Sequence, residues 1–232
     1  MTEQKNDNLD LDAALANTTH KVEDFYQKNK KNINIILITI IAVVGGYIGV
    51  KKFYFEPLEF EAQNEIFKAQ QLFEKDSFAL ALKGDEKKGI KGFEAIADEY
   101  GSTKAGNLAH YYAGICNLRT GNFAAAIEML EGFSTNNDLV GPLATGLLGD
   151  AYVESGDIEK GAGLYMKAAR MNKNKLTAPV FYKKAGIAYE ELKNYDDALS
   201  AYTVIKNDYP EAQENSDIEK YIARVTSLKE GK

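Results

Sequence analysis

Few residues in this chain have the types and spacing that catalysis requires. The two histidines are His20 and His110, and the one cysteine is Cys116. A long apolar run separates the histidines, so we expect neither a metal site nor an acid–base pair from them. Cys116 follows His110 on a segment with helical periodicity. No neighbouring His or Lys pattern would activate its thiol, so we interpret it as a packed side chain.

Sequence signatures of known active sites are also missing. The chain has no G-x-S-x-G, no Walker A sequence and no H-E-x-x-H. We interpret Gly161-Ala162-Gly163 as a packing step, and the acidic pairs Glu190-Glu191 and Asp196-Asp197 as helix-end and turn residues. The sequence therefore predicts a protein that is not an enzyme and that needs no metal and no cofactor.

Charge composition narrows the classes of partner. The chain has 28 Lys and Arg against 34 Asp and Glu, a net charge of -6. It has no basic stripe and no long charged block, so we expect no nucleic-acid binding. With one cysteine, no intramolecular disulfide can form. That fits a reducing compartment, and it fits equally a bacterial periplasmic domain stabilised by its core alone.

An uncharged run from Ile33 to Val50, INIILITIIAVVGGYIGV, is the most informative element. As a helix it would be about 27 Å long, close to the hydrocarbon thickness of a bilayer. Hydrophilic residues 1–32 precede it and Lys51-Lys52 follow it, unlike the arrangement of a cleaved signal peptide. We expect a transmembrane helix over residues 33–52 and a folded domain over residues 53–232. A buried core helix is the alternative.

Small residues within this run form a candidate packing face. Gly45 and Gly49 make a G-x-x-x-G step, and Ala42 with Gly46 makes a second small pair. Small residues let membrane helices approach closely. Our hypothesis is that this face packs on another membrane protein or on a second copy. The alternative is the ordinary glycine content of membrane helices.

Turn signals recur at a nearly constant spacing after the apolar run. Each lies between two segments with helical patterning, and successive signals are 37, 35 and 37 residues apart: Gly84-Asp85, Gly121-Asn122, Gly156-Asp157 and Lys193-Asn194. An abrupt turn between helices needs a positive φ or local side-chain capping, which these residue types supply. The spacing predicts repeated helical hairpins.

Small and bulky residues recur in phase with the last three turns. Seven residues before each turn there is a glycine, and nine residues after it a bulky side chain: Gly114, Gly149 and Gly186, then Leu130, Tyr165 and Tyr202. Paired helices need small residues where their backbones cross and large ones in the grooves between pairs. We predict an all-α protein, with the transmembrane helix followed by a solenoid of about four helical hairpins. The first unit is degenerate, and a helix at about residues 214–229 caps the end.

This pattern resembles the tetratricopeptide repeat, a pair of helices of about 34 residues. The matching segments are AHYYAGICNLRTGNFAAAIEMLEGF (109–133), TGLLGDAYVESGDIEKGAGLYMKAA (145–169) and YKKAGIAYEELKNYDDALSAYTVI (182–205). The resemblance covers roughly residues 60–210. It departs from the repeat pattern at Asn117, which replaces an aromatic residue.

The resemblance implies a binding surface on the first helix of each pair, which lines the inner face of such solenoids. That face would carry Leu108, Tyr111, Ile115 and Leu118, then Leu143, Asp150 and Val153, then Val180, Lys183, Ile187 and Glu190. Its early part is apolar. One interpretation is a groove for a partner segment. The other is that a long helix over residues 58–82 folds back and buries it.

The order of parts resembles the YfgM family of bacterial inner-membrane proteins. The residues that carry the likeness are KVEDFYQKNKKN (21–32), the single anchor, and GFEAIADEYGSTKAGNLAHYYAGI (92–115). The resemblance implies a cytoplasmic N-terminus and a periplasmic repeat domain. This orientation depends mainly on the resemblance, because the lysines that flank the anchor favour it only slightly. It implies as partners the SecYEG translocon, a PpiD-like membrane-anchored prolyl isomerase and chaperone, and emerging secretory chains. An adaptor for another envelope complex and a cytoplasmic scaffold are the alternatives.

Overall fold

The computed structural model describes residues 3–231, with side chains described at Lys21, Glu23 and residues 25–231. Most of these residues are helical. They form two compact units that meet between Pro57 and Leu58.

The first unit is one long helix, α1 (Glu3–Val50), followed by a π-helical turn, η1 (Lys51–Phe55). Its apolar side chains have no covering partner among the described residues; Val43 is 66% exposed and Tyr47 69%. The helical stretch Phe25–Phe73 is long and apolar enough to cross a membrane, and none of its most apolar window is buried. A core helix of a soluble protein would bury this window. The helix therefore has the length and composition of a membrane span or a signal anchor.

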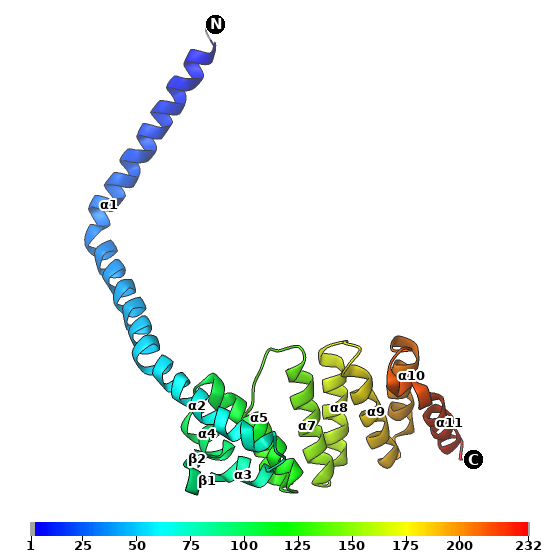
Figure 1. Ribbon diagram of the computed structural model, residues 1–232. Coiled ribbons are helices and arrows are strands. Elements are labelled where there is room, and N and C mark those ends of the chain that lie inside the picture. Colours follow the sequence, from blue (N-terminus) through cyan, green and yellow to red (C-terminus); the bar gives the residue numbers. More distant parts are fainter. Residues whose placement is uncertain (1–2, 232) are drawn as a thin grey trace. The chain divides into compact units, whose positions relative to one another are not determined.

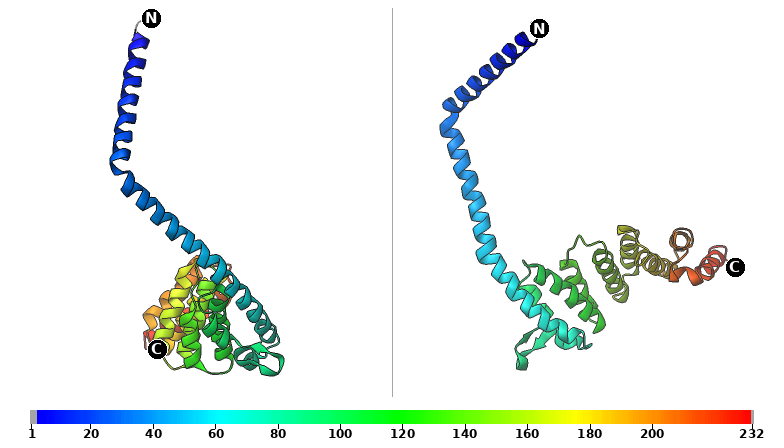
Figure 2. Two further views of the ribbon diagram at one scale, coloured as in Figure 1. Left: turned by 90° about the vertical axis from the view of Figure 1, so that its left-hand side faces the viewer. Right: turned by 45° about the horizontal axis from the view of Figure 1, so that its top comes forward.

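The second unit is a stack of helices in chain order. The elements are α2 (Glu56–Phe73), α3 (Phe78–Lys83), β1 (Gly84–Asp85), η2 (Glu86–Lys88), β2 (Ile90–Lys91), α4 (Phe93–Glu99), α5 (Lys104–Arg119), α6 (Phe123–Gly132), α7 (Val140–Glu154), α8 (Ile158–Met171), α9 (Ala178–Glu191), α10 (Tyr195–Asp208), η3 (Gln213–Asp217) and α11 (Ile218–Lys229). From α4 onward each helix packs on the next. Figure 1 shows α7, α8 and α9 side by side, and the right-hand view of Figure 2 shows the same succession.

Four helical hairpins make up this stack, which confirms the predicted solenoid. They are α3/α4, α5/α6, α7/α8 and α9/α10, and α11 closes the end. The first hairpin differs from the others because a two-stranded antiparallel ribbon replaces its tight turn. In that ribbon Gly84 pairs with Lys91 and Asp85 with Ile90. This explains why the first unit matched the repeat pattern poorly.

Each predicted turn begins with a residue of positive φ: Gly84 (95°), Gly121 (78°), Gly156 (95°) and Lys193 (57°). In the last three turns the following residue donates its backbone N–H to the carbonyl five residues earlier, on Asn117, Tyr152 and Tyr189 respectively. This hydrogen bond closes the C-terminus of a helix when the residue before it is left-handed. The repeated turn is therefore a helix-terminating motif.

The recurring glycines lie where two helices of a hairpin cross. A Cβ at Gly186 would lie 2.3 Å from the ring of Tyr202, and one at Gly149 would lie 2.8 Å from the ring of Tyr165. These aromatic side chains are buried, at 0% and 6% exposed. The spacing of small and bulky residues in the sequence thus reflects direct contact between them.

The predicted helix over residues 58–82 is wrong in its continuity. The helix α2 ends at Phe73, and a turn with Asp76 at φ 55° leads into α3. Ser77 N–H donates to the carbonyl of Leu72, which closes α2 in the same way as the repeat turns. The break brings Phe73 and Phe78 into edge-to-face contact, with ring centroids 5.4 Å apart.

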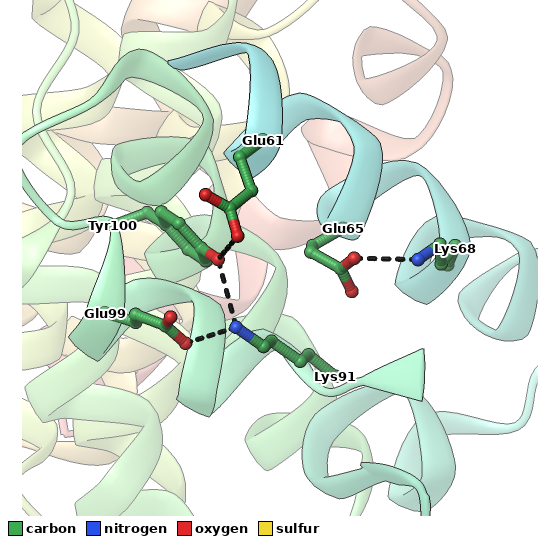
Figure 3. Close-up of polar contacts among 6 residues, drawn as sticks. All are labelled: Glu61, Glu65, Lys68, Lys91, Glu99 and Tyr100. Atoms are coloured by element: carbon green, nitrogen blue, oxygen red, sulfur yellow. Dashed lines mark hydrogen bonds and ion pairs between the residues drawn. The ribbon is translucent and has the colours of Figure 1, made fainter. Parts of the chain in front are cut away.

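Hydrogen bonds fix α2 to the first hairpin, as Figure 3 shows. The buried Tyr100 hydroxyl donates to Glu61 of α2 at 3.1 Å and accepts from Lys91 at 3.0 Å. Lys91 also bonds Glu99 at 2.5 Å, which raises the pKa of Lys91 and lowers that of Glu99. On the same helix, Glu59 accepts the backbone N–H of Lys104 at the start of α5. These contacts make α2 an integral part of the repeat domain.

Candidate interaction groove

A groove of about 930 Å³ runs across the first helices of three hairpins, α5, α7 and α9. We call it the groove throughout. Its lining residues are Phe73, Tyr111, Ile115, Leu118, Arg119, Phe123, Leu143, Leu147, Asp150, Val153, Glu154, Tyr165, Val180, Phe181, Lys184, Ile187, Ala188 and Glu191. Its volume lies at the upper end of the range for small-molecule pockets.

The floor of the groove is apolar and only partly covered. Ile115 and Leu118 of α5 and Val153 of α7 are half-buried, and Ile187 of α9 is 45% exposed. These residues recur because α5, α7 and α9 present equivalent positions to the same side of the stack. An exposed apolar surface framed by polar residues is typical of an interaction site.

The helix α2 contributes its last residue, Phe73, to the groove lining. Its buried residues Ala62, Ile66 and Ala69 belong to the same core cluster as Ala109 and Ala113 of α5. That cluster does not include Ile115 or Leu118. Of the early inner face, Leu108 packs against the cluster that contains α2, whereas Ile115 and Leu118 stay outside it.

An ion pair crosses the middle of the groove. The Asp150 carboxylate accepts two hydrogen bonds from Lys184, at 2.7 and 2.9 Å, and one from the Tyr165 hydroxyl at 2.6 Å. Burial and the hydrogen bond to Asp150 raise the pKa of Tyr165, so it remains a donor. The three residues come from α7, α8 and α9. They fix the relative position of two successive hairpins.

A second network of the same kind lies one repeat further along. Glu190 accepts from Tyr202 at 2.6 Å and from both Nε and Nη2 of Arg224, at 2.9 and 2.7 Å. Each pair joins a carboxylate to a cation 34 residues later, Asp150 to Lys184 and Glu190 to Arg224. The same spacing joins Lys183 to Asp217.

Charged residues mark the rim at the C-terminal ends of the three helices. Arg119, Glu154 and Glu191 are the last residues of α5, α7 and α9. The Arg119 guanidinium lies over the Phe78 ring, 6.0 Å from its centroid. Glu154 and Glu191 are exposed, and no described side chain forms an ion pair with either. The rim is therefore acidic along α7 and α9 and basic at α5.

The structure brings most of the inner-face residues named from the sequence into this groove. Those that line it are Tyr111, Ile115, Leu118, Leu143, Asp150, Val153, Val180 and Ile187. Leu108 packs against the N-terminal core cluster instead. Lys183 bonds Asp217, the last residue of η3, at 2.6 Å, and Glu190 bonds Tyr202 and Arg224. That the groove binds a partner stays a prediction.

Several lining residues were missed in the sequence. Leu147 and Lys184 occupy equivalent positions on α7 and α9, two residues before the crossing glycines Gly149 and Gly186. That fixed offset was a usable signal, since it marks one helical face. Phe73 gave no such signal, because its position depends on the break after α2.

The residues capable of catalysis are placed as packed side chains. Cys116 is fully buried, and burial raises the pKa of its thiol to about 12. Burial also lowers the pKa of His110, whose Nδ1 has no described hydrogen-bond partner. The side chain of His20 lies outside the described residues. Among the side chains described, no group of three or more His, Cys, Asp or Glu could hold a metal ion.

The small-residue face of α1 is open. A Cβ at Gly45, Gly46 or Gly49 would meet no atom within 4 Å, and Ala42 is exposed. The helix can therefore accept a closely packed neighbour along these residues. Its role in docking stays a prediction.

Comparison with known proteins gives one family match. A model of the tetratricopeptide repeat matches residues 181–212, which cover most of α9, all of α10 and the turn that follows. No curated protein matches the chain. The match agrees with the hairpin geometry, so the chain contains a tetratricopeptide repeat. Proteins with this repeat are generally non-catalytic scaffolds for protein–protein interaction.

Proposed function

We propose that this protein is a non-catalytic, membrane-anchored scaffold that serves the bacterial Sec translocon. In this proposal residues 1–32 lie in the cytoplasm, residues 33–52 cross the inner membrane, and residues 53–232 form a periplasmic repeat domain. The groove then holds a PpiD-like prolyl isomerase and chaperone, or secretory chains as they emerge.

The observation that carries the proposal is an uncovered apolar helix joined to a repeat domain with an open groove. The helix supplies a tether, since its apolar window has no buried residue. The repeat domain supplies a binding surface, since Ile187 is exposed in its groove and Ile115 and Val153 are only partly buried there. The sequence resemblance to the YfgM family supports the choice of the translocon as the place of attachment.

Tethering explains how such a scaffold acts without chemistry. A domain held beside the translocon meets its partner at an effective concentration set by the tether, which is in the millimolar range for short linkers. Weak contacts in the groove then suffice to retain a chaperone or a nascent chain. The face formed by Ala42, Gly45, Gly46 and Gly49 would pack laterally on a membrane component.

The test is co-purification from membranes solubilised in a mild detergent, followed by mass spectrometry. We expect SecY and a PpiD-like protein in the set recovered with the intact chain. Gly45→Leu with Gly49→Leu should remove SecY, because leucine prevents close helix approach. Ile41→Leu with Val44→Leu is the matched control and should leave SecY in place. Absence of SecY with the unaltered anchor would end the translocon proposal.

A second pair of variants tests the groove. Ile187→Ser removes an apolar side chain in the groove that is 45% exposed, and Leu80→Ser removes one on α3 that is 46% exposed. We expect the first to reduce recovery of the periplasmic partner while SecY is retained. Equal recovery with both variants would show that the groove does not hold that partner.

Orientation is tested separately by adding protease to spheroplasts. Cleavage of the repeat domain in intact spheroplasts supports a periplasmic location. Protection until the membrane is opened would support a cytoplasmic scaffold. Recovery of another envelope assembly complex in place of SecY would instead support an adaptor for that complex.

A further inference from the structure

We propose that the groove binds an apolar protein segment that ends in lysine or arginine, with its basic end over the C-termini of α7 and α9. This inference rests on that part of the proposed function which makes the groove the binding surface. It adds the chemistry of the bound segment and the direction in which the segment lies.

The apolar part of the bound segment follows from the floor. Ile115, Leu118, Val153 and Ile187 come from three successive hairpins and remain accessible. Covering them with apolar side chains removes their surface from water, which is the main favourable term in such association. Because these residues lie on three helices, a bound segment must be continuous to contact all of them.

The basic end follows from the rim. Glu154 and Glu191 are exposed at the ends of α7 and α9, and neither forms an ion pair with a described side chain. Both side chains lie at helix C-termini, where the helix dipole adds partial negative charge. Two carboxylates and two helix ends therefore favour a cation at the same place.

The cation in the middle of the groove does not reverse this preference. Lys184 donates twice to Asp150, which neutralises its charge. An acidic segment would have to break that ion pair to use Lys184, and it would meet Glu154 and Glu191 at the rim. The groove thus disfavours a carboxylate-ended segment.

The remaining cation sets the direction of the segment. Arg119 ends α5 and lies over the Phe78 ring. A basic residue placed there would meet a like charge, whereas at α7 and α9 it meets opposite charges. The basic end of the segment should therefore lie at α7 and α9, and its apolar part over α5.

The experiment uses the full chain in nanodiscs of phosphatidylcholine and three fluorescein-labelled peptides. The peptides share one apolar core of about six residues, which spans about 20 Å when extended. They end in Lys-Lys, Ser-Ser or Glu-Glu. Binding is measured by fluorescence anisotropy, and binding to empty nanodiscs is subtracted.

We expect the Lys-Lys peptide to bind about tenfold more tightly than the Glu-Glu peptide, as two exposed ion pairs allow. The double variant Glu154→Gln with Glu191→Gln should reduce that ratio to less than about twofold. The matched control is Glu128→Gln with Glu159→Gln, which removes two exposed carboxylates from α6 and α8. It should keep the full ratio.

Three results would overturn the inference: no binding of any peptide, equal binding of all three, or a ratio unchanged by the Glu154 and Glu191 variants. These results are distinguishable from failure of the translocon proposal. Co-purification with SecY can persist when the peptides show no charge preference, and the preference can persist when SecY is absent.

Discussion

The substitution Gly186→Ala tests the packing that holds the repeat domain together. Gly186 lies where α9 crosses α10, and an added Cβ would lie 2.3 Å from Cε1 and 2.6 Å from Cζ of Tyr202. The Tyr202 ring is fully buried, and its hydroxyl donates to Glu190 at 2.6 Å. The ring cannot move aside without losing that hydrogen bond.

The expected cost follows from three contributions. Forcing extra volume into a packed site costs about 1–3 kcal/mol. Weakening the Tyr202 hydrogen bond costs about 1 kcal/mol more. Replacing glycine by alanine inside a helix stabilises the folded state by about 0.5–1 kcal/mol, which offsets part of this loss. We expect Gly186→Ala to lower the free energy of unfolding by about 2 kcal/mol.

The matched control is Gly163→Ala. Gly163 lies inside α8, and a Cβ there would meet no atom within 4 Å. This variant should raise the free energy of unfolding by about 0.5–1 kcal/mol, because only the helix preference of alanine acts. The two glycine-to-alanine changes should therefore act in opposite directions.

Thermal unfolding in mild detergent measures both variants. The chain has 14 tyrosines and no tryptophan, so the near-ultraviolet circular dichroism of tyrosine reports tertiary packing. At about 2–4 °C per kcal/mol for a domain of this size, Gly186→Ala should lower Tm by about 4–8 °C. A Tm at or above that of the unaltered protein would refute the role of Gly186 as a crossing point.

Three further predictions concern single contacts. Arg224→Ala should lower the free energy of unfolding, measured by urea titration, by about 1 kcal/mol. Arg224→Lys should keep only part of that stability, because lysine cannot bond Glu190 through two nitrogens. Tyr100→Phe should lower the free energy of unfolding by about 1 kcal/mol in the same assay, because it removes the hydroxyl that donates to Glu61. An unchanged free energy of unfolding would show that this bond is not needed to hold α2. Cys116 should resist iodoacetamide until the protein unfolds. Burial raises the pKa of the Cys116 thiol from its ordinary value of 9.0 to about 12. Cys116 should therefore contribute stability that is present below pH 9 and falls as the pH rises from 9 toward 12. The variant Cys116→Ala should lose that part of the pH dependence.

The sequence predicts the repeat architecture well because its signals are local. The residues that begin the four turns were found from their types and spacing, and all have positive φ. The small and bulky positions predicted a crossing that the contact of Gly149 with Tyr165 shows directly. Such signals depend on backbone conformation and contact within one hairpin.

The features that were missed depend on packing between helices. The break after Phe73 accompanies the packing of Phe73 against Phe78, and Glu74-Lys75-Asp76-Ser77 contains no glycine or proline to mark it. Lys183 was placed in the groove, but Lys184 lies there, a difference of one residue in helical phase. The ion pair of Asp150 with Lys184 could have corrected it, because the opposite charges lie one repeat apart.

Site-specific photocrosslinking in living cells tests the central claim most directly. A benzophenone amino acid at Ile187 places the reactive group in the groove, and one at Leu80 places it on α3, outside the groove lining. We predict that the Ile187 probe forms an adduct with a PpiD-like isomerase or an emerging secretory chain, and that the Leu80 probe does not. No adduct from Ile187, or the same adducts from both positions, would contradict the account of this protein as a scaffold that binds through its groove.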